Sequence, residues 1–294
     1  MKHHTSIQAK IFQLVNVIIL CFLALACLLP FLNLLAISLS SSTAVSTGRV
    51  NFWPVGFTFD SYRFVLEKPE FYRSFYISVA KVLVGVPLNM VLSIITAYPL
   101  SKTKKEFRAR TGYLWYFLAT IVFSGGLIPW YLVINKLGLI DNFLALVLPV
   151  AVPVFNVVIL ANFFKTIPKG LEEAALIDGA SHWQTMTKIF VPLSTAALAS
   201  IMLFSIVNHW NSWFEGLILM NRPENYPLQS YLQTVVVNRD VRLMTTQNAA
   251  YLSSVSERTS RAAQVFIATL PVVLIYPFLQ RFFTTGLISG SIKE

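Results

Sequence analysis

Charged residues are scarce in this sequence. Asp, Glu, Lys and Arg together make up 12% of its 294 residues, about half of the roughly 25% that is usual in soluble domains. Hydrophobic residues make up 55% and occur in long blocks. This composition excludes an ordinary soluble protein and places the chain among membrane proteins.

The common motifs of catalytic and metal sites are also missing. There is no Gly-Lys dipeptide, and therefore no G-x-x-x-x-G-K-[ST] loop that would bind ATP. There is no D-x-x-D or H-E-x-x-H motif, and His209 has no second His or Cys at ligand spacing. We therefore expect a non-catalytic chain that binds no metal or cofactor itself.

Cysteine is nearly absent, since only Cys21 and Cys27 occur, both in the first apolar block. Six helical residues separate them by about 9 Å along the axis, which disfavours a disulfide. The segment "LALAC" continues directly into the apolar "LLPFLNLL". We therefore expect a retained membrane anchor rather than a cleaved lipoprotein signal.

Six apolar blocks approach the length of about 20 residues that a membrane helix needs. They cover residues 12–39, 75–100, 113–134, 143–164, 193–220 and 262–284. Several contain proline, which membrane helices tolerate because neighbouring helices satisfy the freed backbone groups. We predict an all-α membrane protein with six transmembrane helices in a single domain, residues 1–294.

The net charge of +10 indicates membrane topology rather than nucleic-acid binding, because much of it is concentrated in one short loop. The basic residues of that loop, between the second and third blocks, are Lys102, Lys104, Lys105, Arg108 and Arg110. The next loop, "NKLGLID", has one. Since cytoplasmic loops carry the excess of Lys and Arg, the basic loop, the loop 165–192 and both termini are predicted to be cytoplasmic.

The loop 165–192 contains the acidic stretch "GLEEAALIDGASHWQ". Glu172 and Glu173 lie where a helix dipole favours carboxylates, and Gly179 lies where a helix would end in a left-handed residue. Ser181 and Gln184 form an S-x-x-Q capping box that would begin a second helix. We predict two short helices around a glycine corner, which either meet a cytoplasmic partner or only stabilise the bundle.

The sequence "EEAALIDGASHWQTMTKIFVP" resembles the EAA loop of ABC-importer permease subunits, with the pattern E-A-A-x-x-D-G-A-x₅-F-x-x-I-x-x-P-x₃-P. The matching positions are Glu173, Ala174, Ala175, Asp178, Gly179, Ala180, Ile189 and Pro192. Two positions differ from the family: Met186 stands where it has Phe, and Ala196 stands where it often has a second Pro. The missing proline leaves open only the local bend at the start of the fifth span.

Other segments extend this resemblance over nearly the whole chain. "SGGLIPWYLVINKLGLIDNFLALVLP", "YPLQSYL" and the terminal "GLISGSIKE" are similar to carbohydrate-importer permeases of the maltose type. They look closest to the branch associated with oligosaccharides and polysaccharide fragments.

The resemblance implies the ABC type I importer permease fold, with a coupling helix in the loop 165–192 that fits a groove of a cytoplasmic ATPase. The implied coupling residues are Glu172, Glu173, Ala174, Ala175, Asp178, Gly179 and Ala180. ATP and Mg would be bound by that ATPase. The implied assembly contains a second homologous permease, two ATPase subunits and an extracytoplasmic solute-binding protein. The tail Gly286–Glu294 would reach the interface between the ATPase subunits.

The fifth apolar block carries an unusual polar stretch, "SIVNHWNSWFEG". At about 100° per residue, one arc of this helix holds or borders Ser205, Asn208, His209, Asn211, Ser212 and Glu215. A weaker lane on the second block contains Ser78, Asn89, Ser93 and Thr96. Polar groups at membrane depth face the bundle interior or a water-filled path. They therefore form either a path for sugar hydroxyls or hydrogen bonds between helices.

We expect a transmembrane permease subunit of an ATP-driven ABC importer for carbohydrates in the bacterial cytoplasmic membrane. Oligosaccharides are the expected substrates, and the basic charge and His209 are compatible with acidic ones. The expected contacts are with sugar, membrane lipid and the partner subunits, and not with nucleic acid. The alternatives are an ion-driven secondary transporter or a membrane-embedded lipid or sugar transferase.

Overall fold

The computed structural model describes residues 7–237 and 256–291, and the regular structure in these ranges is helical without strands. The chain forms two compact units, one from Met1–Pro69 with Val235–Thr269 and one from Glu70–Thr234 with Leu270–Glu294. Side chains of the tail predicted to reach the ATPase lie outside the described residues. That residues 1–294 form one transmembrane domain stays a prediction.

The first unit contains one long helix that exposes its apolar side chains. Helix α1 (Ile7–Ser38) is apolar all round, and large side chains such as Phe12 and Phe22 are exposed. A helix that is hydrophobic on every face is typical of a membrane span. The end of α1 packs against α2 (Ser42–Ser46) and a residue of α15 (Glu257–Ser291), Ala262.

The first unit is completed by α3 (Asp60–Leu66). The Ser38 and Tyr62 hydroxyls share a hydrogen bond of 2.7 Å, which connects α1 to α3. Burial raises the pKa of Tyr62 above its usual range, although the hydrogen bond with Ser38 opposes the shift. This keeps the phenol protonated and able to donate to Ser38.

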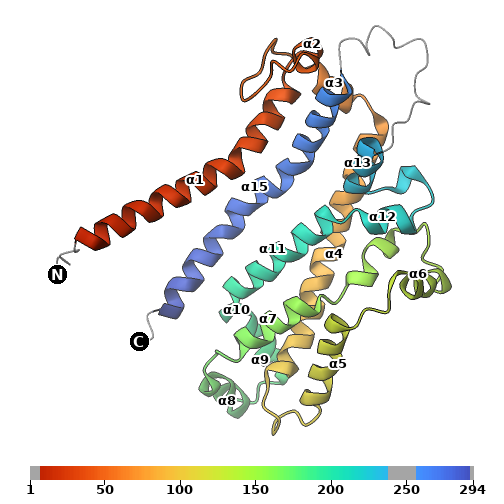
Figure 1. Ribbon diagram of the computed structural model, residues 1–294. Helices are drawn as coiled ribbons and strands as arrows, with labels where there is room; N and C mark the ends of the chain where they lie inside the picture. The colour runs from red at the N-terminus through yellow and green to blue at the C-terminus, as the bar shows by residue number, and fades with distance from the viewer. Residues whose placement is uncertain (1–6, 238–255, 292–294) are drawn as a thin grey trace. The chain divides into compact units, whose positions relative to one another are not determined.

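The second unit is built around one long helix, α4 (Pro69–Ser101). The elements that follow it are α5 (Arg110–Val122), α6 (Leu127–Lys136), η1 (Phe143–Leu146), η2 (Leu148–Val150), α7 (Val154–Phe164), α8 (Lys169–Ile177), α9 (His182–Thr185), the π-helix η3 (Met186–Phe190), α10 (Val191–Leu193), α11 (Thr195–Asn211), α12 (Phe214–Leu219), η4 (Pro223–Asn225) and α13 (Leu228–Val237). In Figure 1, α8 and α9 lie near the Ser101 end of α4, and α12 and α13 lie toward its other end.

The core of the second unit joins α4 to α7, η3 and α11. Its buried apolar side chains include Met90, Leu160, Phe164, Phe190 and Ile201. Phe190 makes edge contacts with the rings of Tyr98 and Phe164, at centroid distances of 5.1 and 5.4 Å. Such pairs contribute about 0.5–1.5 kcal/mol beyond their buried area. The core therefore fixes the end of α4 against η3, in the C-terminal part of the loop 165–192.

Three of the predicted spans are long, continuous apolar helices: Gln8–Ser38, Pro69–Ser101 and Glu257–Phe278. The other three are bent pairs, so the described residues give three membrane-length helices, or up to six if each pair counts as one span. The bent pairs and their angles are Arg110–Val122 with Leu127–Lys136 (114°), Phe143–Val150 with Val154–Phe164 (43°) and His182–Leu193 with Thr195–Asn211 (84°).

The bends have local causes that apolar length alone does not reveal. The predicted straight span 113–134 is interrupted before Gly126, whose φ of 86° is a left-handed value that favours glycine. Pro153 precedes α7 and has no N–H to continue a helix. The bend at the start of the fifth span, at Ser194, is present although Ala196 replaces the family proline.

Asp141 connects the turn after α6 to the turn after α12. It has a left-handed φ of 58°, and its Oδ1 accepts hydrogen bonds from the Asn225 side chain (2.9 Å) and the Asn221 backbone (3.2 Å). Oδ2 lies 3.4 Å from Arg222 Nε. These contacts, led by the one from Asn225, hold the pKa of Asp141 below its usual range.

We predict that substitutions of Asp141 lower the melting temperature in the order Asn, Gly, Ala, from smallest to largest effect. Asn tolerates φ above zero and keeps an acceptor oxygen, Gly keeps only the backbone freedom, and Ala keeps neither. A shift of a few degrees for Ala is expected, and thermal unfolding in detergent measures it. An Ala variant as stable as the Asn variant would contradict this role.

Candidate functional site

The loop 165–192 contains two short helices with a glycine corner, as predicted. Helix α8 ends at Ile177 with Asp178 as its C-cap residue, and Gly179 follows with a φ of 79°. The Gly179 N–H donates to Leu176 O (3.1 Å) and the Ala180 N–H to Ala175 O (2.9 Å). This pair of bonds is the Schellman motif, which ends a helix at a left-handed residue.

The capping box at the start of α9 is confirmed. The Ser181 backbone N–H donates to Gln184 Oε1 (2.9 Å), and the Gln184 backbone N–H donates to Ser181 Oγ (3.3 Å). Two donors at the helix start are thereby satisfied by side chains. Local sequence thus fixes both sides of the corner.

The outer surface of α8 and the corner carries most of the predicted coupling residues. Glu173, Ala174, Asp178 and Gly179 are exposed, and Ala175 and Ala180 are half-buried. Sequence reasoning missed that Ile177 is 85% exposed, which adds an apolar side chain to this acidic surface.

Glu172 lies on the inner side of α8 instead. Its carboxylate is 2.5 Å from the Lys102 ammonium, and both side chains are mostly buried. Lys102 follows the last residue of α4, and burial lowers its pKa below the usual range while Glu172 favours its charged form. The two adjacent glutamates therefore have different surroundings, one within the chain and one at the surface.

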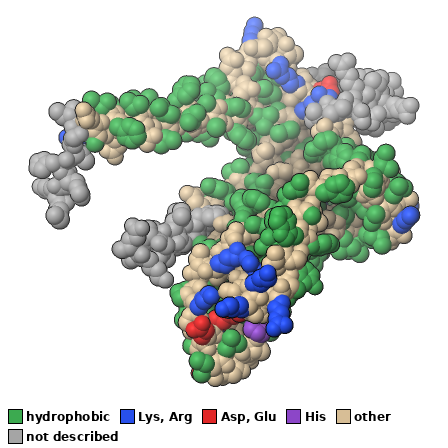
Figure 2. Space-filling view, turned by 60° about the horizontal axis from the view of Figure 1, so that its bottom comes forward, with side chains coloured by type: hydrophobic (Ala, Val, Ile, Leu, Met, Phe, Trp, Pro, Cys, Tyr) green, Lys and Arg blue, Asp and Glu red, His purple; other side chains and the backbone are tan. Residues whose placement is uncertain are grey.

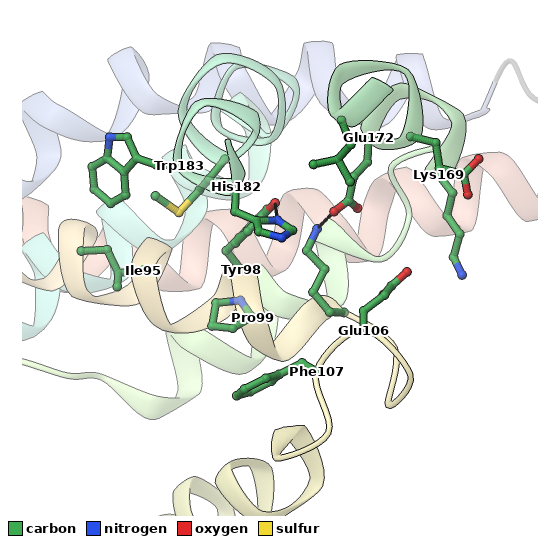
Figure 3. A pocket seen from close by; sticks show the side chains of 13 residues that line it. Ile95, Tyr98, Pro99, Glu106, Phe107, Lys169, Glu172, His182 and Trp183 are labelled. Carbon is green, nitrogen blue, oxygen red and sulfur yellow. Dashed lines mark hydrogen bonds and ion pairs between the residues drawn. The ribbon is translucent and has the colours of Figure 1, made fainter. Parts of the chain in front are cut away.

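A cavity of about 410 Å³ lies between α8, α9 and the end of α4. Figure 3 shows Glu172, His182 and Trp183 on one side and Pro99 and Phe107 on the other. In the lower part of Figure 2, several Lys and Arg side chains lie beside acidic side chains and a His, and other charged side chains lie elsewhere on this face. Exposed basic residues lie in the loop after α4, before and at the start of α8, and in η3: Lys104, Lys105, Arg108, Lys165, Lys169 and Lys188.

The predicted polar lanes of the second and fifth blocks meet between α4 and α11. His209 Nε2 is 2.7 Å from Asn89 Oδ1, and Asn89 Nδ2 donates to Val150 O at 2.8 Å. Lys81 donates to the Ser212 hydroxyl. Lys81, Asn89 and His209 are almost fully buried, so this network connects helices inside the chain.

Five of the remaining lane residues fall into three groups. Ser205 accepts a hydrogen bond of 3.1 Å from Asn156 on α7, and Ser93 is buried without a hydrogen-bond partner for its hydroxyl among the described residues. Asn208 and Asn211 are exposed. Glu215 is half-buried, with an Oε2 that no described residue bonds. Only the two asparagines of α11 thus lie open to a neighbouring chain or solute.

Sequence reasoning missed Lys81 and Asn156 as members of this network. Lys81 is an ionisable residue within an apolar block, and such residues normally have a named partner. Asn156, in the fourth block, is buried and bonds both Ile201 O and Ser205 Oγ. A search for single polar residues in each block would have found both.

Comparison with known proteins identifies the family. Residues 75–289 match the family model described as binding-protein-dependent transport system inner membrane component. The chain belongs to this family. It is therefore a multi-pass membrane protein of the class that forms the non-catalytic permease subunits of ABC transporters.

Two relatives from Bacillus subtilis (strain 168) align over almost the whole chain. The polygalacturonan/rhamnogalacturonan transport system permease protein YtcP is 35% identical, covering 97% of this chain and 99% of that protein. Protein LplC is 35% identical, covering 99% and 97%.

A solved structure has the same fold. It is described as a bacterial ABC transporter involved in the import of the acidic polysaccharide alginate. One of its chains superposes with a TM-score of 0.86 at 33% identity, covering 95% of this chain and 98% of that chain.

The packing of His209 against α4 depends on Gly85. A Cβ on Gly85 would lie 2.5 Å from two atoms of the His209 ring. We predict that Gly85→Ala destabilises this permease-family chain by about 1–3 kcal/mol, as overpacking usually does, and disrupts the His209–Asn89 bond. Thermal unfolding in detergent measures the change.

Gly112→Ala is the matched control, because Gly112 lies in α5 with no atom within 4 Å of the added Cβ. It should be neutral or stabilising by up to about 1 kcal/mol. Equal stability of the two variants would show that the close approach at Gly85 is not required.

Proposed function

We propose that this chain is the permease subunit of an ATP-driven importer for carbohydrates, and that it transports acidic oligosaccharides. The observation that carries the proposal is alignment over almost the full length with YtcP, at 35% identity. The alginate importer chain adds support, with a TM-score of 0.86. The names of both proteins refer to uronate-containing polysaccharides, which supports a negatively charged substrate.

The loop 165–192 is proposed to be the cytoplasmic coupling element. Glu173 and Asp178 offer exposed carboxylates to Arg or Lys of an ATPase subunit, and the small side chains of Ala174 and Gly179 allow close approach. The basic loop after α4 supports the cytoplasmic placement, since Lys and Arg accumulate on that side. ATP and Mg are bound by the ATPase partner.

Transport follows an alternating-access cycle in an assembly with a second homologous permease, two ATPase subunits and a solute-binding protein. Closure of the ATPase dimer moves α8 and its counterpart, and the spans open outward to receive sugar. The exposed Asn208 and Asn211 of α11 supply hydrogen-bond groups for hydroxyls along the path. The proposed path is bordered by Glu215. The buried and half-buried side chains beside it hold the helices that line it in place: Ser205, His209, Ser212, Asn89 and Ser93.

The energy source distinguishes this proposal from an ion-driven transporter. Vesicles containing the whole assembly should take up galacturonate oligomers when ATP is present, with uptake unaffected by ionophores that collapse proton and sodium gradients. ATP depletion should stop uptake. Uptake that follows the ion gradient without ATP would overturn the proposal, and preferential uptake of neutral malto-oligosaccharides would overturn the acidic substrate.

Gly179→Val tests the coupling role of the corner. Valine is β-branched and strained at a φ of 79°, so the substitution should displace α8 from α9. We expect normal membrane insertion with uptake abolished. Gly170→Ala, in the first turn of α8 with open space around the added Cβ, should retain uptake. Full sugar-stimulated ATPase activity and uptake in Gly179→Val would count against the coupling role.

A further inference from the structure

Lys102 occupies an enclosed site at the end of α4. Its ammonium lies 3.9 Å from the centroid of the Tyr98 ring and 4.2 Å from that of Phe190. The third neighbour is the Glu172 carboxylate, at 2.5 Å. Only 8% of the Lys102 side chain and 15% of the Glu172 side chain are exposed. We call these four residues the Lys102 site.

The surroundings make this contact stronger than a surface ion pair. Exposed ion pairs contribute little because water screens them, whereas a cation that is shielded from water interacts more strongly with an aromatic face. Removing one member of a buried pair leaves the other charge uncompensated, which is strongly destabilising. Lys102 and Glu172 therefore stay together while the surrounding rings stay in place.

The neighbouring charged groups do not offer either residue a better partner. Glu106 also acts electrostatically on Lys102, but its carboxylate accepts a hydrogen bond from the Thr103 backbone N–H at 2.6 Å. That bond is the first cause of the lowered pKa of Glu106. Lys169, on α8, acts on Glu106. Glu172 is thus the carboxylate in direct contact with Lys102.

A second contact joins α4 to the other helix of the loop. The Tyr98 hydroxyl lies 3.3 Å from His182 Nδ1 on α9, as Figure 3 shows. Tyr98 lies in the last turn of α4 and Lys102 directly after it, and the Lys102 ammonium lies over the Tyr98 ring. α4 therefore contacts the loop on both sides of Gly179, through Glu172 before the corner and His182 after it.

These contacts connect the loop 165–192 directly to α4, a connection that the chain itself does not make. Along the chain, the loop joins only α7 and the segment leading to α11. α4 belongs to a different part of the sequence and carries Lys81 and Asn89, which bond Ser212 and His209 near the end of α11. A movement of α8 that also moves α4 would thus reach the polar network from a second side.

We infer that Lys102 and Glu172 are positioning residues that make α4 move together with α8, so that motion imposed on the loop reaches the polar network through α4 as well as through α11. This inference rests on the proposed coupling of the loop to an ATPase. It assigns the two adjacent glutamates separate tasks, since Glu173 meets the partner and Glu172 transmits its motion within the chain.

The double variant Lys102→Met/Glu172→Leu separates positioning from stability. Replacing both members of a buried ion pair by apolar residues is often neutral or stabilising, so the assembly should form with wild-type thermal stability. ATP hydrolysis should continue, while uptake of galacturonate oligomers per ATP hydrolysed falls by about tenfold, within the usual range of coupling effects. Lys102→Arg keeps the cation and should retain most of the wild-type ratio.

Lys104→Met is the matched control, because Lys104 is an exposed lysine in the same loop, and its ratio should equal that of the wild type. A wild-type ratio in the double variant would overturn the inference. If the double variant does not assemble, Glu172→Asp, which keeps the charge but shortens the side chain, takes its place. It should give an intermediate ratio, and a wild-type ratio would again overturn the inference. Failure of the wild-type assembly to couple uptake to ATP would instead overturn the proposed function.

Discussion

Polar side chains buried along α4 need partners from other helices, because neither lipid nor a packed core supplies the hydrogen bonds that water would. Asn89 finds His209 and the Val150 carbonyl, and Lys81 finds Ser212. Gly85 leaves room for the His209 ring at the same level. The arrangement of α4 and α11 is therefore set by a few polar contacts as well as by apolar packing, which alone would allow many registers.

The contacts that α4 makes near its middle differ in chemistry from those at its Ser101 end. Toward the middle of α4 the contacts are largely neutral hydrogen bonds, with one lysine that donates to a hydroxyl. At the Ser101 end the contact is a full ion pair enclosed by aromatic rings. A neutral hydrogen bond of about 0.5–1.5 kcal/mol can be exchanged during a conformational cycle more easily than an enclosed ion pair. The end near α8 is thus suited to move as one body, and the middle to rearrange.

The sequence predicted the local structure of the loop 165–192 because each signal there acts over a few residues. Gly179, Ser181 and Gln184 adopt the left-handed corner and the capping box that their identities favour. The apolar blocks likewise located the long helices α1, α4 and α15. The strong bend between α5 and α6 was missed, because hydropathy measures how apolar a segment is and carries no information on its direction.

Long-range pairing was the part that the sequence could not supply. Lys102 was interpreted as one of five topological charges, and its partner Glu172 is 70 residues away. Helical periodicity placed Ser205, Asn208, His209, Ser212 and Glu215 in one arc, but it could not tell which of them face α4 and α7. Asn208 and Asn211 are exposed instead, and that difference depends on where the neighbouring helices lie.

The division between Glu172 and Glu173 follows from helix geometry. Adjacent residues on a helix point about 100° apart, so two consecutive glutamates at the start of α8 cannot face the same surface. One meets Lys102 within the chain and the other is exposed. Glu172 lies in the first turn of α8, where the helix N-terminus favours a carboxylate. An acidic pair at this position therefore presents one carboxylate to the outside and one to Lys102, whereas a single glutamate would provide only one of the two.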